Sequence, residues 1–168
     1  MKMLIAVSSK HGSTRDIGGS IAETIRETGI EVSVADAEDV ESVAPYDAVI
    51  IGSALFMGRW MAPARALVTR SADLLRTRPV WLFSSGPMGR DIVDPADSAE
   101  GIKLLELVGG RDHRLFAGKA DRHELGFGER AILRMVKNPY GDHRDWPAIR
   151  EWAMSIAREL TAVPAGVR

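Results

Sequence analysis

Short apolar runs alternate along this chain with segments of helical periodicity, and no other feature limits the possible folds as strongly. Residues 3–7 (MLIAV), 48–51 (AVII) and 79–83 (PVWLF) contain no charged side chain. Continuous apolar runs of this length are typical of strands that are covered on both faces. Helical segments between such strands predict an α/β domain in which right-handed crossovers build a parallel sheet.

The segments between these runs carry the signals of helix ends. Ser13 or Thr14 can cap a first helix, in which an isoleucine recurs every four residues. A second helix is predicted from Pro63 to about Leu75, and a third over residues 95–108. Asp145 can cap a last helix, whose apolar stripe consists of Ile149, Trp152, Ala153, Ile156, Ala157 and Leu160.

Three glycines lie within or after the first helix. Gly29 stands where a helix C-cap is expected. Gly18 and Gly19 each cost a helix about 1 kcal/mol relative to alanine. They mark either a close approach of the helix to the sheet or two tolerated substitutions.

The remaining strands set the order of the sheet. Residues 30–34 alternate between apolar and polar side chains, which predicts an edge strand with one face in water. Residues 115–117 predict a weaker fifth strand. We therefore expect a three-layer α/β sandwich with a five-stranded parallel sheet in the order 2-1-3-4-5. Residues 1–168 form a single domain in this interpretation, with an insert at residues 119–144 before the last helix.

Composition excludes several classes of function. The chain has no cysteine, which removes disulfides, thiolate metal sites and thiol catalysis. Its 22 Lys and Arg nearly balance its 23 Asp and Glu, so the basic excess of a nucleic-acid binder is missing. Its four histidines form no metal-binding pattern. No apolar run approaches the roughly 18 residues of a membrane span, and we expect a cytoplasmic protein.

The loops after the first, third and fourth strands should converge, because ligands of such sheets bind beyond the carboxyl ends of the strands. The first loop combines hydroxyl groups and a glycine with the amino end of a helix, where backbone N–H groups bind anions. It predicts a cradle for one phosphate monoester, made by Ser9, Lys10, His11, Gly12, Ser13 and Thr14. The second loop contributes Ser53, Ala54, Leu55, Phe56, Met57 and Gly58. The third contributes Ser84, Ser85, Gly86, Pro87, Met88 and Gly89.

The first loop matches neither G-x-G-x-x-G nor G-x-x-x-x-G-K-[ST]. A mononucleotide is therefore favoured over a dinucleotide or a nucleoside triphosphate. Acidic residues that could hold Mg²⁺ are missing after the first strand, where the sequence reads SSKH, so a phospho-acceptor receiver domain is disfavoured.

The loop spacing, the GSALFMG sequence at residues 52–58 and the five-strand alternation resemble the flavodoxin family. The FAGK sequence at residues 116–119, the insert and DWPAIREWA at residues 145–153 resemble a narrower group, the flavodoxin-domain proteins related to menaquinone-dependent protoporphyrinogen oxidase. The resemblance implies that the first loop holds the phosphate of FMN and that the other two loops flank its isoalloxazine ring. It implies no catalytic side chain and no metal.

Aromatic residues near the expected ring are few. Phe56 and Trp60 are the nearby candidates, and the third loop has none. Trp81 and Trp152 are interpreted as core residues. Met57 and Met88 either pack on the flavin or fill gaps.

The resemblance implies an oxidoreductase that passes electrons between a small, protoporphyrinogen-like substrate and a quinone. Three alternatives stay open: a protein that binds a 5-deazaflavin, an NAD(P)H:quinone reductase, and an electron-carrier flavodoxin with a redox protein partner. Carrier flavodoxins are strongly acidic as a family, whereas this chain has a net charge of −1.

Residues 129–137 form a short basic, amphipathic segment of the insert, with Arg130, Arg134 and Lys137. This segment either meets an anionic partner, such as porphyrin propionates or lipid headgroups at the inner membrane face, or forms a solvated face over a small satellite core.

Overall fold

The main sheet has five parallel strands. The computed structural model describes residues 1–86, 95–135 and 140–162. The strands are β1 (Lys2–Ser8), β2 (Glu31–Asp36), β3 (Ala48–Phe56), β5 (Val80–Gly86) and β6 (Asp112–Ala117). They lie in the order β2-β1-β3-β5-β6. Numbered among themselves, these strands have the predicted order 2-1-3-4-5. A short strand, β4 (Arg59–Trp60), folds back antiparallel on the end of β3.

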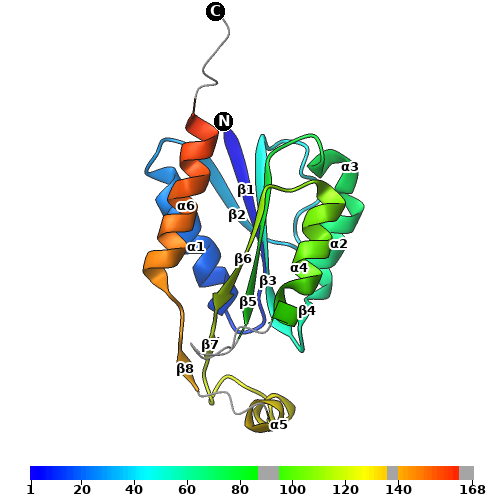
Figure 1. The fold of residues 1–168 in the computed structure, drawn as a ribbon, viewed down its shortest axis with the longest axis vertical. Helices are drawn as coiled ribbons and strands as arrows, with labels where there is room; N and C mark the ends of the chain where they lie inside the picture. Colours follow the sequence, from blue (N-terminus) through cyan, green and yellow to red (C-terminus); the bar gives the residue numbers. More distant parts are fainter. Residues whose placement is uncertain (87–94, 136–139, 163–168) are drawn as a thin grey trace, which may run out of the picture.

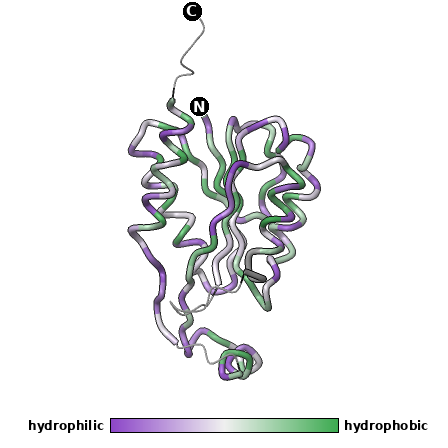
Figure 2. The backbone as a smooth tube through the Cα atoms, viewed as in Figure 1, coloured by the Kyte–Doolittle hydropathy of each residue, from purple (hydrophilic) through white to green (hydrophobic). Residues whose placement is uncertain are grey.

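Helices cover both faces of this sheet (Figure 1). On one face lie α1 (Ser13–Arg26) and α6 (Trp146–Thr161), and on the other lie α2 (Ala62–Arg70), α3 (Ala72–Leu75) and α4 (Pro95–Val108). Green and purple alternate along the helices in Figure 2, as expected when one face of each helix is buried. The predicted three-layer sandwich is confirmed.

Each face of the sheet has its own apolar core. The core under α1 and α6 contains Trp81 and Trp152, as predicted. Phe83, Phe116 and Trp152 pack there as a trio with ring centroids 5.6–6.2 Å apart. β2 lies at the end of the sheet order, which confirms the predicted edge strand. Val32 is buried there, whereas Val34, on the same predicted face, is exposed.

Several predicted element ends differ from the structure. The helix predicted from Pro63 to Leu75 is interrupted at Ser71, which separates α2 from α3. The prediction that Ser13 or Thr14 caps α1 is wrong, because Gly12 is the N-cap, with φ 84° and no side-chain cap. The Asp145 cap is confirmed: Oδ1 accepts a hydrogen bond from the Ala148 N–H at 3.1 Å.

Gly18 and Gly19 prove to serve different purposes. A Cβ at Gly18 would lie 2.8 Å from Val7 Cγ1, so a side chain there would push α1 off the sheet. At Gly19 no atom lies within 4 Å of a Cβ. The close-approach interpretation therefore holds for Gly18 alone.

This difference gives a paired prediction on stability. Gly18→Ala is expected to lower the free energy of unfolding by about 1–3 kcal/mol through overpacking. Gly19→Ala is expected to raise it by up to about 1 kcal/mol through helix propensity. Urea unfolding of both variants measures the two changes, and equal changes of the same sign would contradict the assignment.

The insert projects beyond the carboxyl edge of the sheet (Figure 1). Its base is a two-stranded antiparallel ladder of β7 (Lys119–Ala120) and β8 (Gly141–Asp142). Its outer end carries α5 (Phe127–Met135), which begins two residues before the helical segment predicted at residues 129–137. Lys137, the last residue of that segment, lies outside the described residues.

Candidate functional site

Three serines mark the edge where the predicted loops meet. Ser8 pairs in register with Ser53 across β1 and β3, and Ser53 pairs with Ser84 across β3 and β5. The first and second loops and the start of the third therefore leave the sheet side by side. Pro87, Met88 and Gly89 of the third loop lie outside the described residues.

The first loop offers donors that no protein group uses. The hydroxyl oxygens of Ser8 and Ser9 are buried and have no hydrogen-bond partner in the described part of the chain. The N-cap of α1 supplies no side-chain acceptor to the first N–H groups of this helix. Thr14 is buried in its first turn. Unpartnered buried hydroxyls are rare, and here they lie beside a helix N-terminus, where anions are stabilised.

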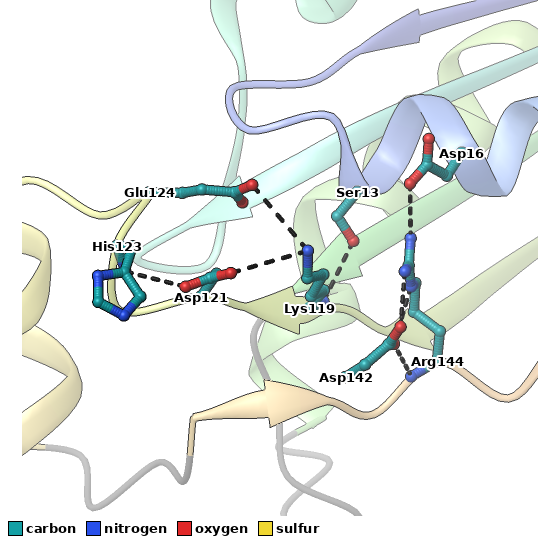
Figure 3. A network of polar contacts seen from close by, with 8 residues as sticks. All are labelled: Ser13, Asp16, Lys119, Asp121, His123, Glu124, Asp142 and Arg144. Carbon is teal, nitrogen blue, oxygen red and sulfur yellow. Dashed lines mark hydrogen bonds and ion pairs between the residues drawn. The ribbon is translucent and has the colours of Figure 1, made fainter.

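Ser13 has a different partner from the one the sequence suggests. Its Oγ accepts a hydrogen bond from the backbone N–H of Lys119 at 3.1 Å (Figure 3). The hydroxyl thus ties the start of the insert to the first loop. Its O–H remains a donor, because this contact uses a lone pair of the oxygen.

Lys10 and His11 are engaged by a carboxylate of the insert. Oε1 of Glu129 accepts a hydrogen bond from Lys10 Nζ at 2.7 Å and lies 3.1 Å from His11 Nε2. Oε2 accepts a hydrogen bond from the Gly126 N–H at 2.8 Å. The hydrogen bond from Lys10 is the main cause that lowers the pKa of Glu129 to about 2. No local sequence pattern indicates that Glu129 belongs to this site, because more than a hundred residues separate it from the loop.

The second loop is a tight hairpin between β3 and β4. Met57 and Gly58 form its turn with φ of 51° and 73°. Phe56 is 48% exposed and Met57 is 74% exposed. Trp60 is only 2% exposed, so its ring does not face a ligand and Phe56 is the accessible aromatic of the predicted pair. Lys10 Nζ lies 5.7 Å from the Phe56 ring centroid, which joins the first and second loops.

The serines of the second and third loops hold this hairpin in place. Trp60 Nε1 donates a hydrogen bond to Ser84 Oγ at 2.7 Å, and Ser84 Oγ lies 2.8 Å from His113 Nε2. Ser53 Oγ accepts a hydrogen bond from the Met61 N–H at 2.8 Å. Burial lowers the pKa of His113, which favours its neutral form. The side chains of Ser53 and Ser84 therefore position the loops, and Ser85 is also buried.

A second polar network fastens the insert to α1 (Figure 3). Arg144 donates hydrogen bonds to Asp16 at 2.9 Å and to Asp142 at 2.6 Å. The hydrogen bond from Arg144 is the main cause that lowers the pKa of Asp142 to about 2. Lys119 Nζ lies 4.0 Å from carboxylate oxygens of both Asp121 and Glu124. Both ends of the insert thus contact the first turn of α1.

The lowered pKa of Glu129 predicts how acid affects the insert. A carboxyl group with an ordinary value of 4.5 and a folded value of about 2 stabilises the fold above pH 4.5. This contribution is lost as the pH falls toward 2. The free energy of unfolding of wild type minus that of Glu129→Gln should therefore be positive at neutral pH and shrink between pH 4.5 and 2. Urea unfolding across this range measures it, and a difference independent of pH would contradict the ion pair.

Within residues 1–86, 95–135 and 140–162, no group of three or more His, Asp or Glu side chains could hold a metal ion. None of the helices in these ranges is both long and apolar enough to cross a membrane.

Comparison with known proteins agrees with this geometry. The family model described as a flavodoxin domain matches residues 4–146. The protoporphyrinogen IX dehydrogenase [quinone] of Escherichia coli K12 is 30% identical over an alignment of 179 residues, which covers 98% of each chain. Flavodoxin 2 of Bacillus cereus superposes with a TM-score of 0.67 at 18% identity, covering 95% of this chain and 99% of that one. An archaeal flavodoxin superposes with a TM-score of 0.64 at 15% identity, covering 95% and 99%.

Proposed function

Because the chain belongs to the flavodoxin domain family, we propose that it is an FMN-dependent oxidoreductase with its cofactor at the carboxyl edge of the sheet. Bound there, FMN would supply the electron chemistry. The protein would bind and orient it and set the charge around its ring. A nucleophilic side chain is not required, which agrees with the absence of cysteine.

The buried, unpartnered hydroxyl of Ser9 is the observation that carries this proposal. A hydroxyl in this position can donate a hydrogen bond to an acceptor atom of a bound ligand. Thr14 and the first N–H groups of α1, which receive no hydrogen bond from an N-cap side chain, add donors of the same kind. Hydroxyls and backbone amides at a helix N-terminus form a site for one phosphate monoester, as the phosphate of FMN requires.

The hairpin and the end of β5 are suited to flank a flat ring. Phe56 and Met57 are exposed on the hairpin, while Trp60, Ser53 and Ser84 fix its backbone from below. A fixed backbone places its N–H groups in advance, so they can stabilise negative charge that develops on the ring.

Porphyrinogen-like molecules are the proposed electron donor, and a quinone is the proposed acceptor. This assignment follows the name of the E. coli relative, whose whole length the chain matches. A 5-deazaflavin would use the same phosphate cradle and is the second candidate for the cofactor. An NAD(P)H:quinone reductase and an electron carrier with a protein partner would share the FMN site and differ in substrate.

The visible spectrum of the purified protein, followed by fluorescence titration with FMN, riboflavin and a 5-deazaflavin, tests the proposal. Tight FMN binding with much weaker riboflavin binding is the expected result. Porphyrinogen oxidation with a quinone acceptor and NADH consumption then separate the two enzyme classes. Failure to bind any flavin would overturn the proposal, and preference for the deazaflavin would replace the cofactor.

A quinone acceptor also suggests where the protein meets its membrane-bound substrate. Phe127 and Met135 of α5 are 89% and 83% exposed, and Ala131 between them is exposed on the same helix face. We propose that this apolar stripe, together with the exposed Arg134, makes a peripheral contact with anionic lipid.

Liposome co-sedimentation tests this contact. The Phe127→Ser/Met135→Ser variant is expected to lose most of the binding to vesicles with anionic lipid. Leu74, an exposed apolar residue of α3 toward the opposite end of the sheet from α5 (Figure 1), provides the control variant Leu74→Ser. Equal sedimentation of the wild type and both variants would remove the membrane contact from the proposal.

A further inference from the structure

We propose that Glu129 determines the cofactor specificity of this site, because its carboxylate opposes the binding of a second phosphate group beside the first loop. The protein would then accept a flavin monophosphate and reject a flavin with a pyrophosphate, such as FAD. The inference rests on the proposed FMN site and assigns a residue of the insert to it.

Every basic side chain of the first loop is already paired with a carboxylate. Lys10 and His11 both contact Oε1 of Glu129, at 2.7 and 3.1 Å. Arg15 donates a bidentate hydrogen bond to Asp36 at 2.5 and 2.6 Å. What the loop keeps for a ligand are therefore neutral donors, namely hydroxyls and backbone N–H groups.

Two described cations at the base of the insert are also paired with carboxylates. Arg144 contacts Asp16 and Asp142, and Lys119 lies near two carboxylates. Nε of Arg130, beside Glu129 on α5, donates to the Leu125 carbonyl at 3.0 Å. Arg144 and Lys119 are thus balanced by carboxylates of the protein, whereas the carbonyl partner of Arg130 is neutral.

Neutral donors close to the backbone suffice for one phosphate monoester. A pyrophosphate carries additional negative charge, which is stabilised most by charge-assisted hydrogen bonds from lysine or arginine. Here the second phosphate would meet Lys10 already neutralised, and a carboxylate beside it. Like charges at short range oppose binding, more so where water is partly excluded.

Hydrogen bonds to both oxygens fix the orientation of the Glu129 carboxylate. Oε2 of Glu129 accepts the Gly126 N–H at 2.8 Å, so both oxygens are used, and the side chain is 15% exposed. Leu133, one turn further along α5, is buried. Glu129 is thus a fixed negative charge beside Lys10 and His11 of the first loop.

The test compares dissociation constants for FMN and FAD, measured by quenching of flavin fluorescence in wild type, Glu129→Gln and Glu124→Gln. Glu124 is the matched control, because it lies in the same insert and contacts Lys119 but not the loop. We expect wild type to favour FMN by at least tenfold. Glu129→Gln should reduce this preference about tenfold by strengthening FAD binding, while Glu124→Gln leaves it unchanged.

The salt dependence of flavin binding provides a second measurement. Added salt screens the repulsion, so FAD binding to wild type should strengthen relative to FMN binding, and less so in Glu129→Gln. A wild type that binds both flavins equally, or an FMN preference that survives in Glu129→Gln, would overturn the inference and leave the FMN site intact. A wild type that binds neither flavin would overturn the proposed function itself, and this inference with it.

Discussion

Gly52→Val is expected to be among the most destabilising single changes in this protein. A Cβ at Gly52 would overlap the ring of Phe83, and the ring has no room to retreat. Phe116 and Trp152 pack against it with centroids 6.0 and 6.2 Å away. Overpacking a rigid core costs about 1–3 kcal/mol and sometimes more, and we expect about 3 kcal/mol here. Thermal unfolding should show a fall of roughly 6–12 °C in Tm.

A double-mutant cycle gives this prediction its control. Phe83→Leu removes the far end of the ring and should destabilise the protein by itself. In combination with Gly52→Val, part of the loss should be recovered, because the leucine leaves space for the new side chain. Strictly additive free energies of unfolding would show that the two sites do not compete for one volume.

Ser9→Ala/Thr14→Ala is expected to weaken FMN binding by about 3–5 kcal/mol, which is roughly a hundredfold to several thousandfold. Hydrogen bonds to a charged group contribute about 1.5–3 kcal/mol each, and two are removed. These positions are preferred to Ser13, whose hydroxyl already contacts the Lys119 N–H. Fluorescence titration measures the change.

Riboflavin is the control ligand, because it has the ring of FMN and no phosphate. Its affinity should be nearly equal in wild type and in the double variant. A parallel loss of both affinities would point to a distorted loop, and an unchanged FMN affinity would move the phosphate site elsewhere.

The sequence was sufficient for those parts of the structure that follow from local patterns. Apolar runs and their alternation with helices predicted the order of the sheet, and the alternation of apolar and polar residues over residues 30–34 predicted the edge strand. Asp145 was found because a capping aspartate contacts an N–H only three residues away. Each of these signals lies within a few residues of what it determines.

The rest depends on contacts between distant segments. Glu129 reaches the first loop, and Trp60 is buried because its indole N–H meets Ser84 on another strand. Gly12 takes the N-cap of α1 although two hydroxyl residues follow it, and this leaves the loop hydroxyls without a capping role. Local preference predicted a cap there, whereas in the described part of the chain the hydroxyls of Ser8 and Ser9 have no partner.

The paired strands β7 and β8 make the excursion between them a separable module. The chain leaves the domain at Lys119 and returns at Asp142, and these two residues are partners in register. Since departure and return are adjacent, a longer or shorter excursion changes the closure entropy only slightly, because this entropy grows slowly with loop length. Evolution or an engineer can therefore exchange this module for another of different size while the five-stranded sheet keeps its geometry, at the cost of the contacts that Glu129 makes with Lys10 and His11.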